Sequence, residues 1–462
     1  MSHAQAFHTS CRDGLGGTSG FQISAATPSL DRDQLAAMSS AHARYEPAPD
    51  APYEPTLEQM REFPVALRMS RVQGVGPLVS RTEYVGREYR GRNGAPDEGR
   101  FGNYFCHMVV GNSEGDPFDG LMAVELWDAP HWTTTDATDT TLEALGPLSP
   151  GQADLATVLA AVTAAPEGLG VALVDAALTA IEGGATLLIV DPVAARAVTW
   201  IAWIAYSLPT HVAHTLTFST YEGRPQDILD LHVVATLPAC DNGATMNSRV
   251  TRVDVTEAPQ LTGTPSLYAR AVAALATQGP EALASAVRMV RVDGAASQGA
   301  SLAIIGKLTE LVTDDDLPAV LEQILAMVRG GRTADAAEAA ASLTASEPGD
   351  RAAIGLWAQL YAEARRSTSG DAARDLATIA LGRLVEHLDH LPDPFPALPA
   401  DTHAAPGVAG IGAWLRATEA AQGTDASGRL VLQGVQLRLI GLNVPVDNRV
   451  GAVIAADLER PA

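Results

Sequence analysis

The sequence contains only three cysteines in 462 residues, and this scarcity excludes a protein built around disulfides. Cys11, Cys106 and Cys240 are an odd number, and none of them forms a Cys-x-x-Cys pair. Domains that depend on a disulfide framework carry more cysteines in a much shorter chain. We therefore expect a protein of the reducing cytoplasm.

Long uninterrupted apolar runs are also missing. The longest, at 185–208, contains Asp191, Pro192 and Arg196, each of which is costly in the hydrocarbon core of a bilayer. Residues 1–10 have no basic region followed by an apolar stretch, which a signal peptide requires. We therefore expect neither a membrane span nor a signal peptide.

Basic side chains are few compared with acidic ones. The chain has 31 Lys and Arg residues against 54 Asp and Glu residues, which gives a net charge of −23. An electrostatic field of this sign repels the phosphate backbone of nucleic acids. We therefore expect no nucleic-acid partner.

The parts of a nucleotide-binding P-loop are absent. The glycine-rich segment 14–20 lacks the Gly-Lys-Ser/Thr ending and is predicted to join two strands, not to open a helix. Residues 187–191, Leu-Leu-Ile-Val-Asp, have the pattern of a Walker B strand. The single lysine, Lys307, has neither the glycine spacing nor a following Ser or Thr. We therefore expect no P-loop NTPase activity and no cofactor.

The fold class predicted from the remaining pattern is α+β with several domains. Eighteen of the 23 aromatic residues lie at or before Tyr221, which indicates that the two parts of the chain build different cores. Residues 1–145 are predicted to form a β-rich domain with a helix at 29–45, capped by Asp31 or Ser29. The expected strands, of which the first two form a hairpin, are 4–12, 21–27, 65–71, 82–89, 104–110 and 121–126.

Residues 150–260 are predicted to form an α/β domain, because helical spacing alternates there with short apolar runs of the length of a buried strand. The expected helices are 153–164, 170–181 and 193–207, and the expected strands are 186–190, 215–220 and 230–236.

Residues 265–390 are predicted to form an array of about seven short helices, followed at 391–462 by a linker and a short β tail. Two segments, 317–328 and 373–388, repeat apolar residues at i, i+3, i+4 and i+7. The apolar positions of the first are Leu317, Val320, Leu321, Ile324, Leu325 and Val328.

Two residues are candidates for a cysteine-dependent active site. A thiolate nucleophile needs a histidine beside it, and Cys11 meets His107 only if their strands lie next to each other. Unmodified cysteine is, however, among the residue types most often buried in protein cores. We therefore favour core positions for both side chains and assign no catalytic residue.

Two clusters contain residue types that bind zinc. The first is His211 and His214, which have no acidic or thiol residue close by in sequence; the second is 386–390, Glu-His-Leu-Asp-His, at the end of a predicted helix. A zinc site needs three or four converging ligands, and histidines are common at helix C-termini for electrostatic reasons. We therefore expect no metal site.

Arginines form the first group of candidate partner-binding residues. Residues 61–100 hold eight arginines and five acidic residues, a net-positive stretch in an acidic chain. Arg87, Arg90 and Arg92 are candidates for docking an acidic partner surface or a nucleotide phosphate. The alternative is a solvated face of a sheet.

Tryptophans form the second group. Trp127 and Trp132 flank Pro130 at the end of a predicted strand. They are candidates for interface anchors, since Trp is enriched among residues that dominate binding energy. The alternative is a local core around the turn.

Several strings, taken together, resemble a known family. Residues 7–30 (FHTSCRDGLGGTSGFQISAATPSL), 99–110 (GRFGNYFCHMVV) and 126–132 (LWDAPHW) resemble the type-two N-terminal domain of the family called GTPase-associated protein one. Residues 186–225, which contain TLLIVDPVAARAVTWIAWIAYSLP and HTLTFSTYEGRP, resemble that family's middle domain. The resemblance covers about half of the chain, 4–255.

The resemblance implies an adaptor without enzymatic activity, of a kind found in actinobacteria and related bacteria. Such an adaptor binds a small GTPase and other proteins of a multi-gene conflict system, for example in defence against phage. The family brings no set of catalytic residues, so none is transferred. The alternative function is a small-ligand sensor or a cysteine-dependent enzyme that uses the β-rich domain.

Overall fold

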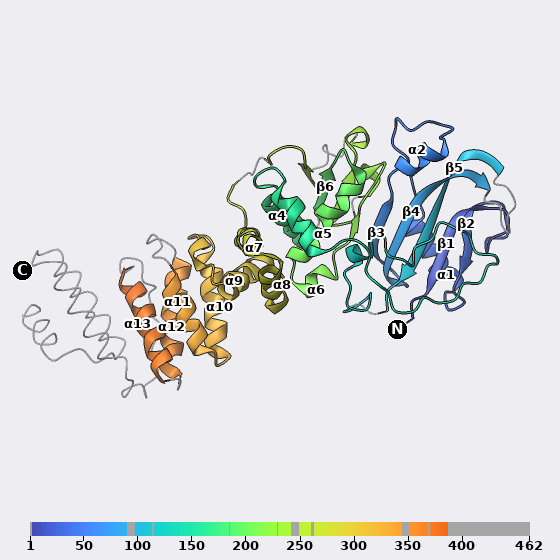
Figure 1. Cartoon of the computed structure of the whole chain (residues 1–462). Coiled ribbons are helices and arrows are strands. Elements are labelled where there is room, and N and C mark those ends of the chain that lie inside the picture. Colours follow the sequence, from blue (N-terminus) through green and yellow to red (C-terminus); the bar gives the residue numbers. More distant parts are fainter. Residues whose placement is uncertain are drawn as a thin grey trace, which may run out of the picture. The chain divides into compact units, whose positions relative to one another are not determined.

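The computed structural model describes residues 2–89, 98–112, 115–183, 185–228, 230–241, 249–259, 263–343, 351–367 and 370–386 (Figure 1). The chain divides into two compact units, Met1–Arg291 and Val292–Ala462. The linker and β tail predicted at 391–462 lie outside the described residues.

One sheet of nine strands runs through the first unit in the order β2-β1-β5-β4-β3-β7-β8-β6-β9. Its first five strands are antiparallel, and the hairpin predicted from residues 4–27 is confirmed by the pairing of β1 with β2. These strands are β1 (Gln5–Cys11), β2 (Gly20–Ala26), β3 (Ala66–Val72), β4 (Gly76–Tyr89) and β5 (Glu98–Val110).

The other four strands are parallel to one another. They are β6 (Thr186–Val190), β7 (Phe218–Ser219), β8 (Val233–Thr236) and β9 (Val250–Asp254). All residues of β6 and β8 are buried, as expected for strands covered on both faces. Strand β9 was not predicted from the sequence.

A short antiparallel pairing joins the two halves of the sheet. Met69 of β3 lies opposite Phe218 of β7, and Leu67 exchanges hydrogen bonds with Thr220 just beyond β7. Beside this pairing, Arg68 forms a buried ion pair with Glu222. The β-rich region and the α/β region therefore share one sheet and one hydrogen-bond ladder.

The helices of the first unit begin where the sequence supplies caps. Helix α1 (Arg32–His42) has a capping box, in which Asp31 accepts from the Gln34 backbone and Gln34 accepts from the Asp31 backbone. The cap predicted at Asp31 is thereby confirmed. The same motif, from Thr56 and Gln59, begins α2 (Leu57–Glu62).

The prediction of a strand at 121–126 is wrong. Residues Ala123–Leu126 form a 3₁₀-helix, because Glu125 turns back and accepts a hydrogen bond from the Met122 backbone at 2.8 Å. Valine and leucine suggested a strand, but a local turn uses the same apolar residues to fill the core beneath it, where Val124 and Leu126 are buried.

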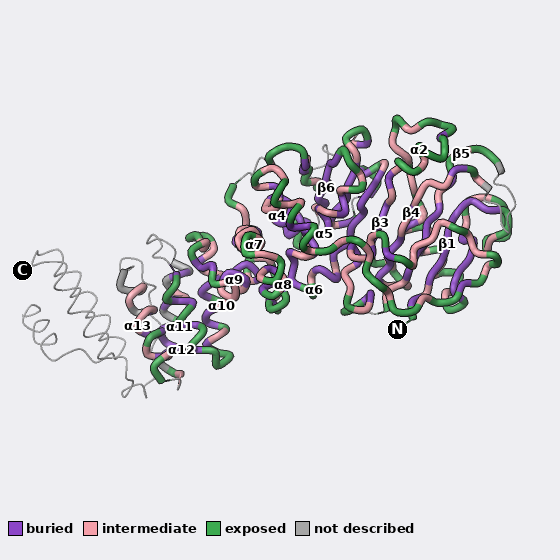
Figure 2. The backbone as a smooth tube through the Cα atoms, in the orientation of Figure 1, coloured by how far each residue is buried: buried purple, intermediate pink, exposed green. Residues whose placement is uncertain are grey.

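The middle of the unit contains the three helices predicted at 153–164, 170–181 and 193–207. Helix α5 packs against α3, α4 and α8, and nine of its eleven residues are buried (Figure 2). The helices are α3 (Leu155–Thr163), α4 (Leu169–Gly183), α5 (Ala197–Ser207), α6 (Thr210–Ala213), α7 (Leu267–Gln278) and α8 (Pro280–Met289).

The second unit is helical throughout its described residues. Helix α10 packs against α12 and α11 packs against α13, so alternate helices stack in two rows. All six apolar positions predicted at 317–328 are buried. The helices are α9 (Ala295–Ile305), α10 (Leu317–Arg329), α11 (Thr333–Ser342), α12 (Arg351–Arg366) and α13 (Gly370–Glu386).

The predicted fold class is confirmed as a β-rich N-terminal region, an α/β middle and a helical C-terminal region. The domain boundaries at 145, 150, 260 and 265 stay predictions. No helix among the described residues is long and apolar enough to cross a membrane.

The ion pair at the junction gives a test of how the two halves are held together. Changing Glu222 to Gln leaves the Arg68 guanidinium buried without an opposite charge, and we expect the free energy of unfolding to fall by about 3 kcal/mol. Urea unfolding followed by tryptophan fluorescence measures this loss.

The matched control is Glu46→Gln. Glu46 pairs with Arg224 at 2.6 Å, but the two side chains are 49% and 60% exposed. We expect a loss below about 1 kcal/mol for this variant. Equal losses for the two variants would contradict a special role for the buried pair.

Candidate functional site

The two candidates for a cysteine-dependent site lie apart on adjacent strands. β1 and β5 pair so that Phe7 is opposite His107 and His8 is opposite Cys106. Cys11 is four residues beyond Phe7, which corresponds to about 13 Å along a strand. The structure therefore does not place Cys11 against His107, although both side chains are buried.

The His107 imidazole has partners that fix it in the neutral form. The Thr133 backbone donates to Nδ1 at 3.4 Å, so Nε2 carries the proton and donates to Gln5 Oε1 at 2.8 Å. Burial lowers the pKa of His107 to about 3. A general base that works near neutral pH needs a pKa near 7, so His107 in this setting is a core residue.

Trp132 packs against His107. Its ring lies edge-on to His107, with 5.0 Å between the ring centroids, and its indole N–H donates to the Leu126 carbonyl at 2.6 Å. These contacts correspond to the local core around the turn. An anchoring role for Trp132 stays a prediction.

Asp191 directly follows the Walker B-like strand, and both oxygens of its carboxylate accept hydrogen bonds from within the fold. It accepts from Arg196 Nε and Nη2 at 2.8 Å, from Trp200 Nε1 at 2.7 Å and from the Val193 backbone at 2.8 Å. Its exposed fraction is 1%. The carboxylate therefore fixes the loop after β6.

The two candidate metal clusters differ in how much of each is described. His211 is exposed on α6, while His214, just after α6, is buried. The cluster at 386–390 lies outside the described residues except for Glu386. Within the described ranges, no group of three or more His, Cys, Asp or Glu residues is placed to hold a metal ion.

The arginine-rich stretch is largely used within the fold. Arg87 lies over the Phe101 ring, 4.5 Å from its centroid, and donates to the Gly99 carbonyl at 2.6 Å. Arg90 and Arg92 lie outside the described residues. Partner binding by these three arginines stays a prediction.

Trp127 lines a groove of about 650 Å³ at the carboxyl ends of β6 and β8, which we call the Trp127 groove. Ligands of parallel α/β sheets bind outside the carboxyl ends of the strands. Walls come from both halves of the sheet and include Phe63, Pro64 and Trp127 from the first half and Pro192, Val193 and Leu237 from the second.

Hydrogen bonds from the core position each wall of the groove. Tyr45 donates to the Pro64 carbonyl at 2.8 Å, and Asp191 holds the Val193 backbone. Gly151 packs so closely against Trp127 that a Cβ atom there would overlap the Trp127 carbonyl oxygen. The groove is therefore set by the fold and does not depend on a ligand for its shape.

The surface of the groove is apolar. Only three of its sixteen lining residues, Asp50, Arg61 and Glu62, are charged. Val193 on one wall is 50% exposed. Tyr53 and Leu57, neighbours in sequence of the first wall, are 73% and 75% exposed.

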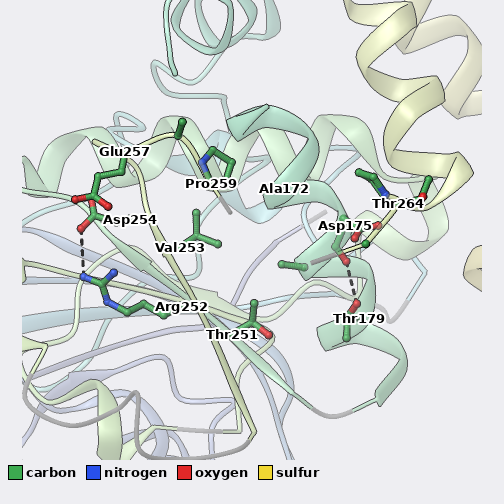
Figure 3. A pocket seen from close by; sticks show the side chains of 14 residues that line it. Ala172, Asp175, Thr179, Thr251, Arg252, Val253, Asp254, Glu257, Pro259 and Thr264 are labelled. Atoms are coloured by element: carbon green, nitrogen blue, oxygen red, sulfur yellow. Dashed lines mark hydrogen bonds and ion pairs between the residues drawn. The ribbon is translucent and has the colours of Figure 1, made fainter. Parts of the chain in front are cut away.

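A second hollow, of about 500 Å³, lies between α4 and β9 (Figure 3). It is acidic, but two of its three carboxylates serve the fold: Asp254 pairs with Arg252 at 3.2 Å, and Asp175 accepts from the Ser266 backbone at 2.9 Å. This hollow offers little apolar surface to a protein partner, so the Trp127 groove is the better candidate.

Both halves of the sheet match models of known protein domains. Residues 2–148 match the model for "GTPase-associated protein 1, N-terminal domain type 2". Residues 156–256 match the model for "GTPase-associated protein 1, middle domain". The chain belongs to the GTPase-associated protein 1 family. The family name associates these domains with GTPases in general.

The chain is also similar to two curated proteins of Mycolicibacterium smegmatis, both named "Putative ESX-1 scaffolding and assembly protein SaeB". The protein of strain MKD8 is 27% identical over 246 residues, covering 50% of this chain and 28% of the relative. The protein of strain ATCC 700084 / mc(2)155 is 27% identical over 225 residues, covering 46% and 26%.

This chain therefore spans about a quarter of the length of the curated relatives it matches. No solved structure matches it significantly.

The sequence pointed to Trp127 but not to the rest of its groove. Phe63 and Val193 were missed because their exposure depends on how distant segments pack. One signal was present: Val193 follows the strand 186–190 directly, and residues at that end of a buried parallel strand commonly line a binding site.

The buried histidines of the GTPase-associated protein 1 N-terminal domain give a pH-dependent prediction. His8 lies beside the stacked rings of Phe21 and Tyr104, with ring centroids 6.1 and 5.9 Å away. Burial lowers the pKa of His8 to about 4. Between about pH 6.5 and pH 4 only the unfolded chain is protonated at this residue, so stability falls as the pH falls.

We expect His8→Phe to keep the aromatic stack and to remove this titration. As the pH is lowered from 7 to 5, the free energy of unfolding measured in urea should decrease less steeply in the variant than in the wild type. Below pH 6 the two slopes should differ by roughly 1 kcal/mol per pH unit. An unchanged slope would contradict the neutral, buried state of His8.

Proposed function

We propose that this chain is a non-enzymatic adaptor that binds a small GTPase through the Trp127 groove. The proposal rests on one observation: the walls of this groove come from both GTPase-associated protein 1 domains. A partner seated there contacts both domains together. The adaptor acts in the cytoplasm.

The chemistry of the groove favours a protein over a nucleotide or a nucleic acid. Its walls are mainly proline, alanine and valine with one tryptophan, and they carry few groups that could bind a phosphate. Protein interfaces concentrate their binding energy in such dry, apolar pockets around an aromatic residue. An aliphatic or aromatic side chain of the GTPase fills the groove between Trp127 and Val193.

The helical second unit supports a scaffolding role. Stacked short helices offer an extended surface for binding other proteins. The curated relatives are named for scaffolding and assembly. We propose that the array binds further proteins of a bacterial multi-gene conflict system, such as one that acts against phage.

The test is a binding measurement with a small GTPase from the same genome, loaded with GDP or with a GTP analogue. Val193→Asp places a charge in the apolar groove at a half-exposed position. We expect the dissociation constant to rise at least about tenfold. Surface plasmon resonance with the full chain measures it.

Leu15→Asp is the matched control, because Leu15 is 49% exposed and lies in the connection between β1 and β2, away from the groove. This variant should bind the GTPase as the wild type does. Equal binding by Val193→Asp and wild type would refute the groove as the docking site, and no binding of either nucleotide form by the wild type would refute the adaptor.

A further inference from the structure

A third concave site lies on the same sheet as the Trp127 groove but at the opposite end of β8. This cavity has a volume of about 500 Å³ and lies between the end of α1, strand β3 and the segments that enter β7 and β8. We call it the Arg44 pocket. His232, which precedes β8, lines the pocket, and Leu237, which follows β8, lines the groove. Its size is typical of pockets that hold small molecules.

The charge of the Arg44 pocket is opposite to that of the whole chain. Three arginines, Arg44, Arg68 and Arg71, line it together with one carboxylate, Asp230. Burial lowers the pKa of His232, so this side chain is neutral at pH 7. The lining therefore carries a net charge of +2 in a chain of net charge −23, and of +1 once Glu222, the ion-pair partner of Arg68, is counted.

Two of these arginines are held in place before any ligand arrives. Arg68 donates from Nη1 to the Ala41 carbonyl at 2.9 Å, and Arg44 donates from Nη2 to the same oxygen at 3.0 Å. This carbonyl belongs to the last turn of α1, the end of a helix that attracts cations. The shared acceptor brings two guanidinium groups to one side of the pocket.

The positive potential of the Arg44 pocket contributes to the lowered pKa values of neighbouring groups. Burial and then the charge of Arg68 lower the pKa of Arg44. Burial, followed by the charges of Arg68 and Arg44, lowers the pKa of His42. Glu222, Asp230 and Asp227 already relieve part of this crowding of like charges for Arg44, and an anion in the pocket would relieve it further.

The remaining lining provides polar groups and small apolar walls. Gln73 offers an exposed amide, whereas the hydroxyls of Ser70 and Thr217 have partners within the fold. Val72, Ile228 and Leu231 form the apolar part. Apart from the imidazole of His232, no aromatic ring is present among the thirteen lining residues, so the pocket has no platform for stacking a nucleotide base.

We propose that the Arg44 pocket binds the oxyanion group, phosphate or carboxylate, of a small molecule. Guanidinium groups match these anions in shape and charge, and two exposed arginines, Arg44 and Arg71, line the pocket together with the Gln73 amide. Because the pocket and the groove lie at opposite ends of β8, this binding does not require the GTPase partner.

The test measures the melting temperature of the full chain with inorganic phosphate, with citrate and with chloride at matched ionic strength. A ligand that binds only the folded state raises the melting temperature as its concentration rises. A rise with phosphate alone assigns a phosphorylated ligand, and a rise with citrate alone assigns a carboxylate ligand. A rise with both supports a site for oxyanions in general, and no rise with either at millimolar concentration overturns the proposal.

The variant Arg44→Ala/Arg71→Ala identifies the location of the anion. Both side chains are exposed, so the fold should be retained. We expect the dissociation constant from calorimetric titration to rise at least about tenfold. Arg32→Ala/Arg288→Ala, which removes two exposed arginines elsewhere, should leave it unchanged.

Gln73→Glu provides a second variant that adds a negative charge to the lining without removing an arginine. It should weaken anion binding even if the double variant is unstable. Binding that survives both sets of changes, or that is weakened equally by the control, would overturn the assignment to this pocket.

Discussion

The pairing of β3 with β7 decides the arrangement of the first unit, because it joins an antiparallel sheet and a parallel sheet into one ladder. The pairing is only two residues long, and the Arg68–Glu222 ion pair lies directly beside it. Burying two charges costs nearly as much as their attraction returns, so the pair adds little net stability. A shift of register, however, would leave both charges buried and unpaired. The pair therefore favours one register of β3 on β7 over the adjacent registers. The Trp127 groove and the Arg44 pocket both depend on that register.

A carboxylate at the end of a buried parallel strand can hold a metal ion or organise a loop. Asp191 has the sequence context of the first role and the contacts of the second. Its four hydrogen bonds come from a guanidinium, an indole and a backbone amide, all within nine residues. These donors neutralise the charge and leave the carboxylate no room for a cation. The strand and its acid thus shape one wall of a groove, and the chemistry of the motif is structural.

Some parts of the fold could be predicted because their signal is local. The segment 186–190 is a run of five apolar or β-branched residues, and the six apolar positions between 317 and 328 follow the helical period, so neighbouring residues alone decide these elements. Strand β9 could not be found in this way. Only one of its five residues is buried, since it lies at the edge of the sheet, and an edge strand has a weak alternation of polar and apolar residues.

The candidate site was less predictable than the fold, because most of its signal is not local in the sequence. Trp127 was identified because tryptophan is rare and often anchors an interface. Phe63 and Val193 are 130 residues apart, and nothing in either neighbourhood shows that they line one groove. Only the long-range pairing of β3 with β7 brings them together. A single sequence contains no pattern that reports such a pairing.

The continuous sheet also limits how this architecture can be divided. A fragment that ended between the two family domains would leave β3 with a row of unsatisfied backbone N–H and C=O groups, and such a bare edge recruits other strands and promotes self-association. The described helices beyond residue 291 belong to a separate compact unit and contribute no strand to this sheet. Because the ladder runs through both family domains, we expect these two domains to be inherited as one block.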